Sequence, residues 1–156
     1  MKLNKGFTLL ELLIVIAIIG ILAAVISVST SSGRNKGADG GIKQQLVLAR
    51  SQAEIVWNTR TANLNTYTSV CTNGTVDGVT GIGGHVLKAT QIYGLAAVGG
   101  NGVAGSPSTA TCHDSAGAYA AEVPLRGGTN QMWCIDSTGK SEQNTGSALP
   151  VGDYTC

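Results

Sequence analysis

The residues that could carry catalytic chemistry do not stand at spacings that would let them act together. The two histidines, His85 and His113, lie outside any H-E-x-x-H zinc motif. No serine is framed by the glycines of a nucleophile elbow, and the glycines form no phosphate-binding G-x-x-x-x-G-K-[ST] loop. We expect His113, beside Cys112 and Asp114, in a surface loop rather than at a metal. The sequence therefore predicts neither an enzyme nor a bound cofactor.

Two aspartates leave a calcium site open as an alternative. Asp136 and Asp153 could join backbone carbonyls around the ion, but their spacing is unlike that of an EF-hand loop. The sequence therefore favours a chain without a metal site.

Four cysteines, all in the distal half of the chain, have the chemistry of structural cross-links. No pair has C-x-x-C spacing, and an even number in a polar domain beyond a membrane-length segment indicates two disulfides formed in an oxidising compartment. Three pairings are possible. We favour the sequential one because each bond then closes a contiguous loop, worth about 3–4 kcal/mol in the chain-entropy model. The bonds would be Cys71–Cys112 and Cys134–Cys156.

One carboxylate lies inside an apolar segment. Phe7 to Ile26 is a run of twenty residues that is apolar except for Thr8 and Glu11. As a helix this run would be about 30 Å long, which matches the hydrocarbon layer of a bilayer. A charge in lipid costs about 3 kcal/mol or more, so Glu11, which we expect to be unpaired there, is a functional candidate.

The flanks of this run indicate its orientation. Lys2 and Lys5 precede it, and positive charge before an apolar segment keeps the N-terminus in the cytoplasm. A cleaved secretory signal peptide is an alternative, because Ala23-Ala24 could supply the small residues of its cleavage site. A plain signal anchor with Glu11 at the headgroup level is another.

The stretch from Lys5-Gly6-Phe7-Thr8-Leu9-Leu10-Glu11 to Ala24 resembles the class III signal of type IV pilins and their pseudopilin relatives. The resemblance covers about the first 25 residues. It implies that residues 1–6 are a leader, that a prepilin peptidase cuts between Gly6 and Phe7, and that the new amine of Phe7 is methylated. It also implies that the apolar helix anchors the chain in lipid and later forms the core of a helical filament.

The resemblance gives Glu11 a role in assembly. The matching glutamate of pilins is thought to meet the N-terminal amine of a neighbouring subunit. A buried carboxylate is tolerated when it is paired. An incoming subunit would therefore be selected by the charge that it neutralises.

The middle of the chain continues the helix with one weak section. Pilins usually carry a proline near position 28, where this chain has Val28. After the apolar helix, 7–28, the glycines of residues 29–41 lower helix propensity by about 1 kcal/mol each. This section could bend or melt, or it could be a linker or a continuous helix. The helical period of residues 42–66 predicts an amphipathic helix. Leu48 and Trp57 would widen its apolar stripe. The stripe itself consists of Ile42, Leu46, Ala49, Ala53, Val56, Arg60 and Leu64.

The sequence of the distal part, 67–156, predicts a small sheet. Strands are expected at 118–125, 131–135 and 140–143, with a turn at Asp136-Ser137-Thr138-Gly139. The stretch 133–140 resembles a C-terminal hairpin found in a group of bacterial pilins, and Tyr67 to Cys71 matches a second segment of that group. Trp133 should cover the helix–sheet core or the adjacent disulfide. The fold expected is α+β and pilin-like, with a long N-terminal helix packed on a small antiparallel sheet that disulfides hold together.

The balance of charged residues gives no reason to expect a strongly charged binding partner. Beyond residue 30, eight Lys or Arg residues are balanced by eight Asp or Glu residues, so no nucleic-acid binding is expected. The resemblance implies a homo-oligomeric pilus subunit, with a prepilin peptidase and an inner-membrane assembly platform as partners. The subunit would lie in the inner membrane, with its N-terminus cytoplasmic, before it reaches a surface filament. The alternatives are a pseudopilin of a type II secretion system and a minor pilin with lectin-like binding.

Overall fold

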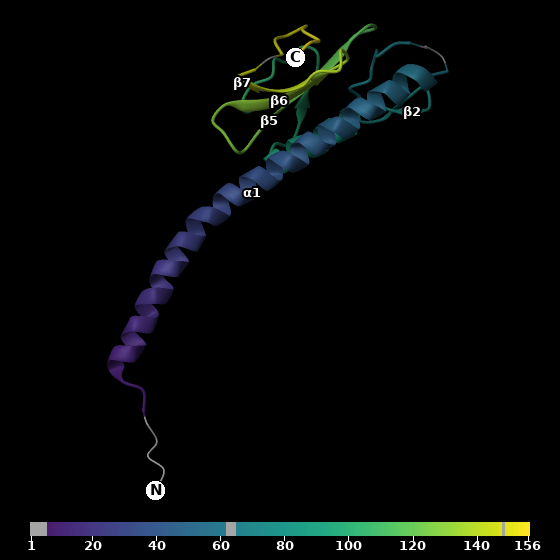
Figure 1. The fold of residues 1–156 in the computed structure, drawn as a ribbon. Coiled ribbons are helices and arrows are strands. Elements are labelled where there is room, and N and C mark those ends of the chain that lie inside the picture. The colour runs from purple at the N-terminus through teal and green to yellow at the C-terminus, as the bar shows by residue number, and fades with distance from the viewer. Residues whose placement is uncertain (1–5, 62–64, 148) are drawn as a thin grey trace. The chain divides into compact units, whose positions relative to one another are not determined.

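The computed structural model describes residues 6–61, 65–147 and 149–156, with the backbone alone at 27–29. Residues 1–5 of the expected leader, and Leu64 of the expected stripe, lie outside these ranges. The elements follow one another along the chain as Figure 1 shows: α1 (Leu9–Thr59), β1 (Thr75–Val76), β2 (Val79–Thr80), α2 (Gly83–Tyr93), β3 (Val98–Gly99), β4 (Ala110–Asp114), β5 (Tyr119–Pro124), β6 (Gln131–Asp136) and β7 (Ser141–Thr145).

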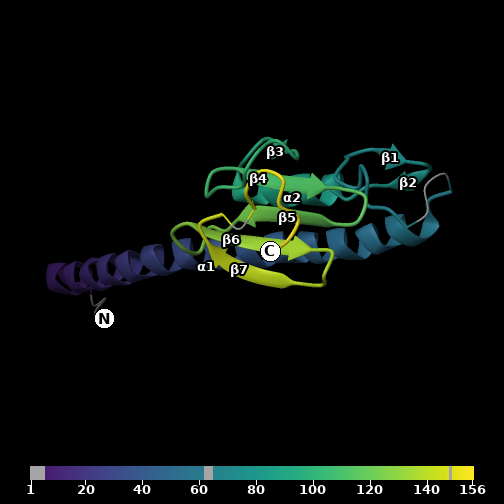
Figure 2. The same cartoon turned by 90° about the horizontal axis from the view of Figure 1, so that it is seen from above.

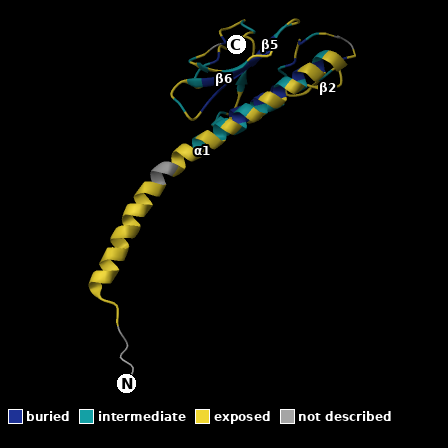
Figure 3. Cartoon of the chain, viewed as in Figure 1, coloured by how far each residue is buried: buried dark blue, intermediate teal, exposed yellow. Residues whose placement is uncertain are grey.

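The contacts within the chain divide it into two units, Met1–Arg34 and Asn35–Cys156, which we describe separately. In the first unit, the apolar side chains that the structure describes are exposed, from 45% at Val15 to 86% at Leu9. Figure 3 shows this exposure in the N-terminal part of α1 that precedes the grey section. Among the described residues, α1 is the one helix that is long and apolar enough to cross a membrane.

The backbone of α1 runs through the Gly-rich section at 29–41 without a break. The helix ends at Thr59, however, and not near Thr66 as expected. The chain reverses there because Asn65, with a positive φ of 57°, donates its N–H to the carbonyl of Trp57 at 3.1 Å. Arg60 turns inward at the same point and is buried.

The expected apolar stripe faces the core of the second unit. Ile42, Leu46, Ala49, Ala53 and Val56 are fully buried. The prediction for Leu48 was wrong, since its side chain is 43% exposed. Leu48 stands two residues after Leu46, which turns it toward the opposite side of the helix.

The main sheet has the strand order β3-β4-β5-β6-β7. From β4 to β7 the pairing is antiparallel, with Cys112 opposite Ala121 and Ala121 opposite Ile135. The strands expected at 118–125, 131–135 and 140–143 are β5, β6 and β7. The short strand β3 pairs parallel to β4, so the sheet is not purely antiparallel. The segment around His85 forms helix α2.

The sheet is covered on both faces. Alternate residues Cys112, Tyr119, Ala121, Val123 and Ile135 pack with α1 and α2 in one core. Figure 2 shows these elements side by side. On the other face, a smaller cluster joins Leu149 of the C-terminal segment to the sheet residues Ala120 and Cys134.

Trp133 lies at the edge of the main core, as expected. Its ring is partly buried against that core. The ammonium Nζ of Lys43, on α1, lies 4.3 Å from the centroid of the ring, which is a cation–π distance.

Candidate functional site

The start of α1 is organised by two side chains three residues apart. Thr8 donates its backbone N–H to Glu11 Oε2 at 2.9 Å and its hydroxyl to the same oxygen at 2.8 Å. The N–H of Glu11 donates to Thr8 Oγ1 at 3.2 Å. This reciprocal arrangement is a capping box, in which the first and fourth residues of a helix start satisfy each other's free N–H groups.

The capping box gives the carboxylate of Glu11 two neutral hydrogen-bond donors, which the expectation of an unpaired charge did not include. In the isolated chain the carboxylate accepts two hydrogen bonds from Thr8, which offset part of the cost of placing it in an apolar segment. The spacing T-x-x-E before an apolar run is the sequence signal that would have revealed this contact.

Gly6 and Phe7 lie before the helix, and both are exposed. The side chain of Phe7 is 85% exposed. The peptide bond between them is therefore not held in helical hydrogen bonds. A protease could reach it without unwinding α1.

The structure joins Cys71 to Cys112 and Cys134 to Cys156, with Cα–Cα distances of 5.7 Å in both bonds. The first bond ties the segment after α1 to β4. The second ties β6 to the C-terminal segment. In the chain-entropy model each such loop closure stabilises the fold by about 3–4 kcal/mol.

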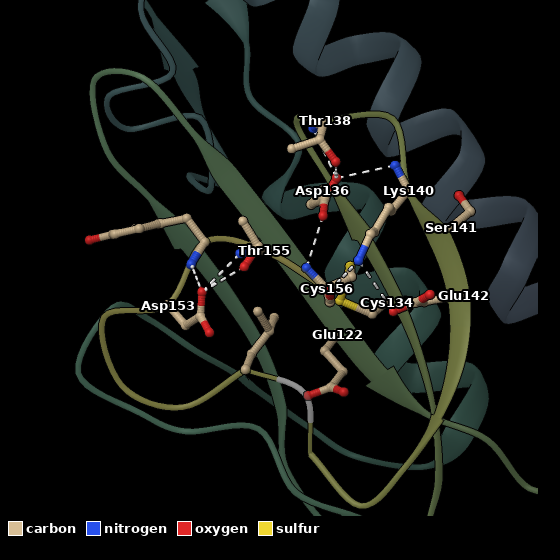
Figure 4. The surroundings of a disulfide bond; sticks show 12 residues. Glu122, Cys134, Asp136, Thr138, Lys140, Ser141, Glu142, Asp153, Thr155 and Cys156 are labelled. Atoms are coloured by element: carbon tan, nitrogen blue, oxygen red, sulfur yellow. Dashed lines mark hydrogen bonds and ion pairs between the residues drawn. A yellow bond between two sulfur atoms is a disulfide. The ribbon is translucent and has the colours of Figure 1, made fainter.

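Asp136 sits at the second disulfide and orders the turn after β6 (Figure 4). Its Oδ1 accepts hydrogen bonds from the N–H and hydroxyl of Thr138 and from the N–H of Lys140, at 2.9, 2.6 and 3.1 Å. Its Oδ2 accepts the N–H of Cys156 at 2.8 Å. Burial raises the pKa of Asp136, but these hydrogen bonds together outweigh burial and leave the pKa below its ordinary value.

Both ring nitrogens of His113 are engaged in contacts within the chain. The prediction that His113 lies in a surface loop was wrong: it is fully buried on β4. Its Nδ1 lies 2.8 Å from the carbonyl oxygen of Asp153, and its Nε2 lies 2.9 Å from that of Val103. The strand that holds His113 could not be recognised from the sequence, because the segments around it are rich in glycine. On this strand His113 alternates with core residues.

Asp153 uses its carboxylate locally. Its Oδ1 accepts the N–H of Tyr154 and the N–H and hydroxyl of Thr155. In the part of the chain that the structure describes, no group of three or more His, Cys, Asp or Glu side chains could hold a metal ion.

Two further carboxylates tie α1 to the rest of the second unit. Asp39 accepts the backbone N–H of Arg126 at 2.6 Å and that of Gly127 at 2.9 Å. Asp77 accepts hydrogen bonds from Arg60 in a two-residue turn with Gly78, where both have positive φ. The Asp-Gly dipeptide is a hairpin signal that is visible in the sequence.

A family model described as the prokaryotic N-terminal methylation motif matches residues 1–27. No curated protein and no solved structure matches the chain significantly. The motif supports a type IV pilin-like prepilin signal, and thereby a precursor of the pilin or pseudopilin type. The long helix, the small sheet and the two disulfides form an α+β, pilin-like architecture. The signal implies processing by a prepilin peptidase and insertion into a membrane before filament assembly.

Proposed function

We propose that this chain is the structural subunit of a type IV pilus. A prepilin peptidase would cut between Gly6 and Phe7 and methylate the new amine of Phe7. The mature chain would then polymerise through its apolar helix into a surface filament that serves adhesion, motility or DNA uptake. The observation that carries the proposal is the methylation motif at the start of a membrane-length helix whose apolar side chains are exposed.

Exposed apolar side chains need an apolar environment. Leu9, Leu10, Ile21 and Ile26 are each at least 64% exposed in the isolated chain. Exposing apolar surface to water costs a free energy of about 25 cal/mol for each Å². Lipid would cover these side chains before assembly. Copies of the same helix would cover them afterwards, and the inner-membrane assembly platform would mediate the transfer.

The capping box makes Glu11 ready for this transfer. Thr8 offers it two neutral donors, which suffice while no cation is present. The methylated amine of a neighbouring Phe7 offers a full positive charge in a medium of low dielectric constant, where charge pairing is strongest. The exchange of neutral donors for a cation favours the assembled state.

The second unit, Asn35–Cys156, which we also call the distal unit, has the cross-links of a domain that works outside the cell. Disulfides persist in oxidising compartments, and the two bonds here close loops with sequence separations of 41 and 22. The bond at Cys156 also fastens the C-terminal segment over the sheet. This construction supports an exposed filament subunit.

The test is to delete the gene and restore it with wild type, Glu11→Val or Glu142→Gln. Glu142 is a solvent-accessible carboxylate of the distal unit and serves as the matched control. We expect electron microscopy to show long filaments with wild type and Glu142→Gln but not with Glu11→Val. All three chains should be cleaved at the Gly6–Phe7 bond. Intact filaments in the deletion strain, together with a defect in protein secretion, would overturn the pilus role and identify a pseudopilin.

A further inference from the structure

The sequence contains two Asn-Gly dipeptides, Asn73-Gly74 and Asn101-Gly102. All four residues are exposed. Asn-Gly is the pair most open to intramolecular attack, because glycine has no side chain to shield its backbone nitrogen. The two sites therefore share their chemistry and their access to water. They differ in what holds the asparagine.

The side chain of Asn101 is held by Asp114. Its Nδ2 donates to the carbonyl oxygen of Asp114 at 3.0 Å and to Oδ1 at 3.3 Å, and its Oδ1 accepts the N–H of Asp114 at 2.7 Å. These bonds direct the amide toward β4. The amide carbon would have to leave them to meet the nitrogen of Gly102.

The side chain of Asn73 has no such restraint. Within the described residues its amide makes no hydrogen bond, while Gly74 donates its N–H to Thr72 Oγ1 in a long bond of 3.3 Å. Apart from the neighbouring residues in the chain, this hydroxyl is the one described group within 4 Å of the place where a Cβ of Gly74 would stand. The amide of Asn73 is therefore free to approach the nitrogen of Gly74, whose one competing contact is the long bond to Thr72 Oγ1.

We propose that Asn73 is a site of spontaneous deamidation and that Asn101 is protected by its bonds to Asp114. The Gly74 nitrogen loses its proton and attacks Cγ of Asn73. The new N–C bond closes a succinimide ring, and the Cγ–Nδ2 bond breaks to release ammonia. Water then opens the ring at either carbonyl and leaves aspartate or isoaspartate at position 73.

The product would change the segment that precedes α2. Thr72 accepts the N–H of Gly83 at 2.9 Å, and Gly74 accepts the N–H of Gly81 at 2.9 Å. Isoaspartate adds a methylene to the main chain between these two contacts, so both cannot keep their geometry. Deamidation also adds a negative charge to the chain beyond residue 30, in which eight basic residues balance eight acidic ones.

The new carboxylate would lie at a pocket. Asn73 lines an open pocket of about 300 Å³ together with Leu87, Val98 and the disulfide Cys71–Cys112, and its described lining carries no charged side chain. Deamidation would therefore give this neutral pocket its first charge. The reaction does not depend on the pilus role.

The two sites can be compared within one molecule. The processed full-length chain, in detergent, is incubated at mildly alkaline pH, reduced and digested with trypsin. Cleavage after Arg60, Lys88 and Arg126 puts Asn73 and Asn101 on separate peptides. Mass spectrometry then follows the replacement of the amide by a carboxyl group. We expect Asn73 to react roughly tenfold faster than Asn101, about the effect of one or two net hydrogen bonds.

Two controls keep the experiment decisive. Unfolding the reduced chain should bring the two rates together, because the contacts with Asp114 are lost. Gly74→Ala should slow the reaction at position 73 without disturbing the fold, since its Cβ meets only Thr72 Oγ1 at 3.8 Å. Equal rates in the folded chain, or a faster reaction at Asn101, would overturn the proposal. So would an Asn73 that reacts only after unfolding.

Discussion

The guanidinium group of Arg60, just beyond the end of α1, lies 2.8 Å from the Oδ2 atom of Asp77 in the turn between β1 and β2. Arg60 also donates to the carbonyl oxygen of Thr68 at 2.5 Å. The side chain of Arg60 is 4% exposed and that of Asp77 is 24% exposed, so the pair is largely out of water. It fastens the end of the helix to the segment that follows.

Removing one member of this pair should destabilise the distal unit. We expect Arg60→Met to lower the free energy of unfolding by about 3 kcal/mol, because Asp77 would stay partly buried without its cation. Urea unfolding of the full chain in detergent, followed by the fluorescence of Trp57 and Trp133, measures this. The double variant Arg60→Met with Asp77→Asn should recover part of the loss. Lys36→Ala, at an exposed position, is the control, and an Arg60→Met variant as stable as this control would refute the prediction.

Much of the distal unit follows from its sequence, and the exceptions have physical causes. The stripe from Ile42 to Val56 and the strands β5 to β7 are visible as helical and alternating periods. Just beyond the helix end at Thr59, Arg60 contacts Thr68 and Asp77, and no local pattern contains these contacts. The burial of His113 depends on the C-terminal segment covering the sheet, which the strand pattern alone does not reveal.

The candidate site also combines features that the local sequence predicts with contacts between distant residues that it does not. Gly6, Phe7 and Glu11 could be proposed from the sequence alone, because they lie within the contiguous methylation motif at residues 1–27. The capping box of Thr8 and Glu11 was equally local, and its spacing was present in the sequence. The clamp between Asp39 and the backbone of Gly127 spans 88 residues and could not be predicted without the fold.

Asp136 should make stability depend on acid pH. Its folded pKa lies below the ordinary value of 3.8, because its hydrogen bonds to Thr138, Cys156 and Lys140 together outweigh the opposing effect of burial. The contribution is therefore complete above the ordinary pKa and is lost as the pH falls through the lower, folded value. Urea unfolding at a series of acid pH values should show this loss in wild type and in the exposed control Glu142→Gln. Asp136→Asn should lack it, and an unchanged pH dependence in that variant would contradict the assignment.

Tyr67 should report on its contact with α1 at alkaline pH. Burial, with the hydrogen bond from its hydroxyl to Glu54 Oε1 at 3.0 Å and the charge of Glu54, raises the pKa of Tyr67 to about 12 from 10.0. The neutral phenol therefore contributes stability that is complete below the ordinary pKa of 10.0 and is lost as the pH rises through about 12.

An absorbance titration of phenolate in the full chain tests this. Glu54→Gln keeps an acceptor for the hydroxyl but removes the charge, so the transition of Tyr67 should move to lower pH without reaching its ordinary position. Tyr67→Phe identifies which of the four tyrosines is responsible. A transition that does not move in Glu54→Gln would show that burial acts alone.

The start of α1 allows its hydrogen bonds to be separated from its charge. Thr8→Val removes the hydroxyl of the capping box and keeps the carboxylate. Glu11→Gln keeps a side chain that can cap the helix and removes the charge. A missing N-cap contact costs about 1 kcal/mol. We therefore expect the first amides of α1 to exchange hydrogen about fivefold faster in Thr8→Val, with Thr8→Ser and Glu11→Gln close to wild type.

For filament assembly we expect the reverse: the charge of Glu11 should matter and the hydroxyl of Thr8 should not. If the charge of Glu11 selects the incoming amine, Glu11→Gln should be cleaved normally yet fail to form filaments, while Thr8→Val should still assemble. Hydrogen exchange of the processed chain in detergent and electron microscopy of the cells measure the two effects separately. Filaments of normal number from Glu11→Gln would rule out selection by charge. Exchange rates that are equal in Thr8→Val and Thr8→Ser would show that the hydroxyl does not stabilise the helix start.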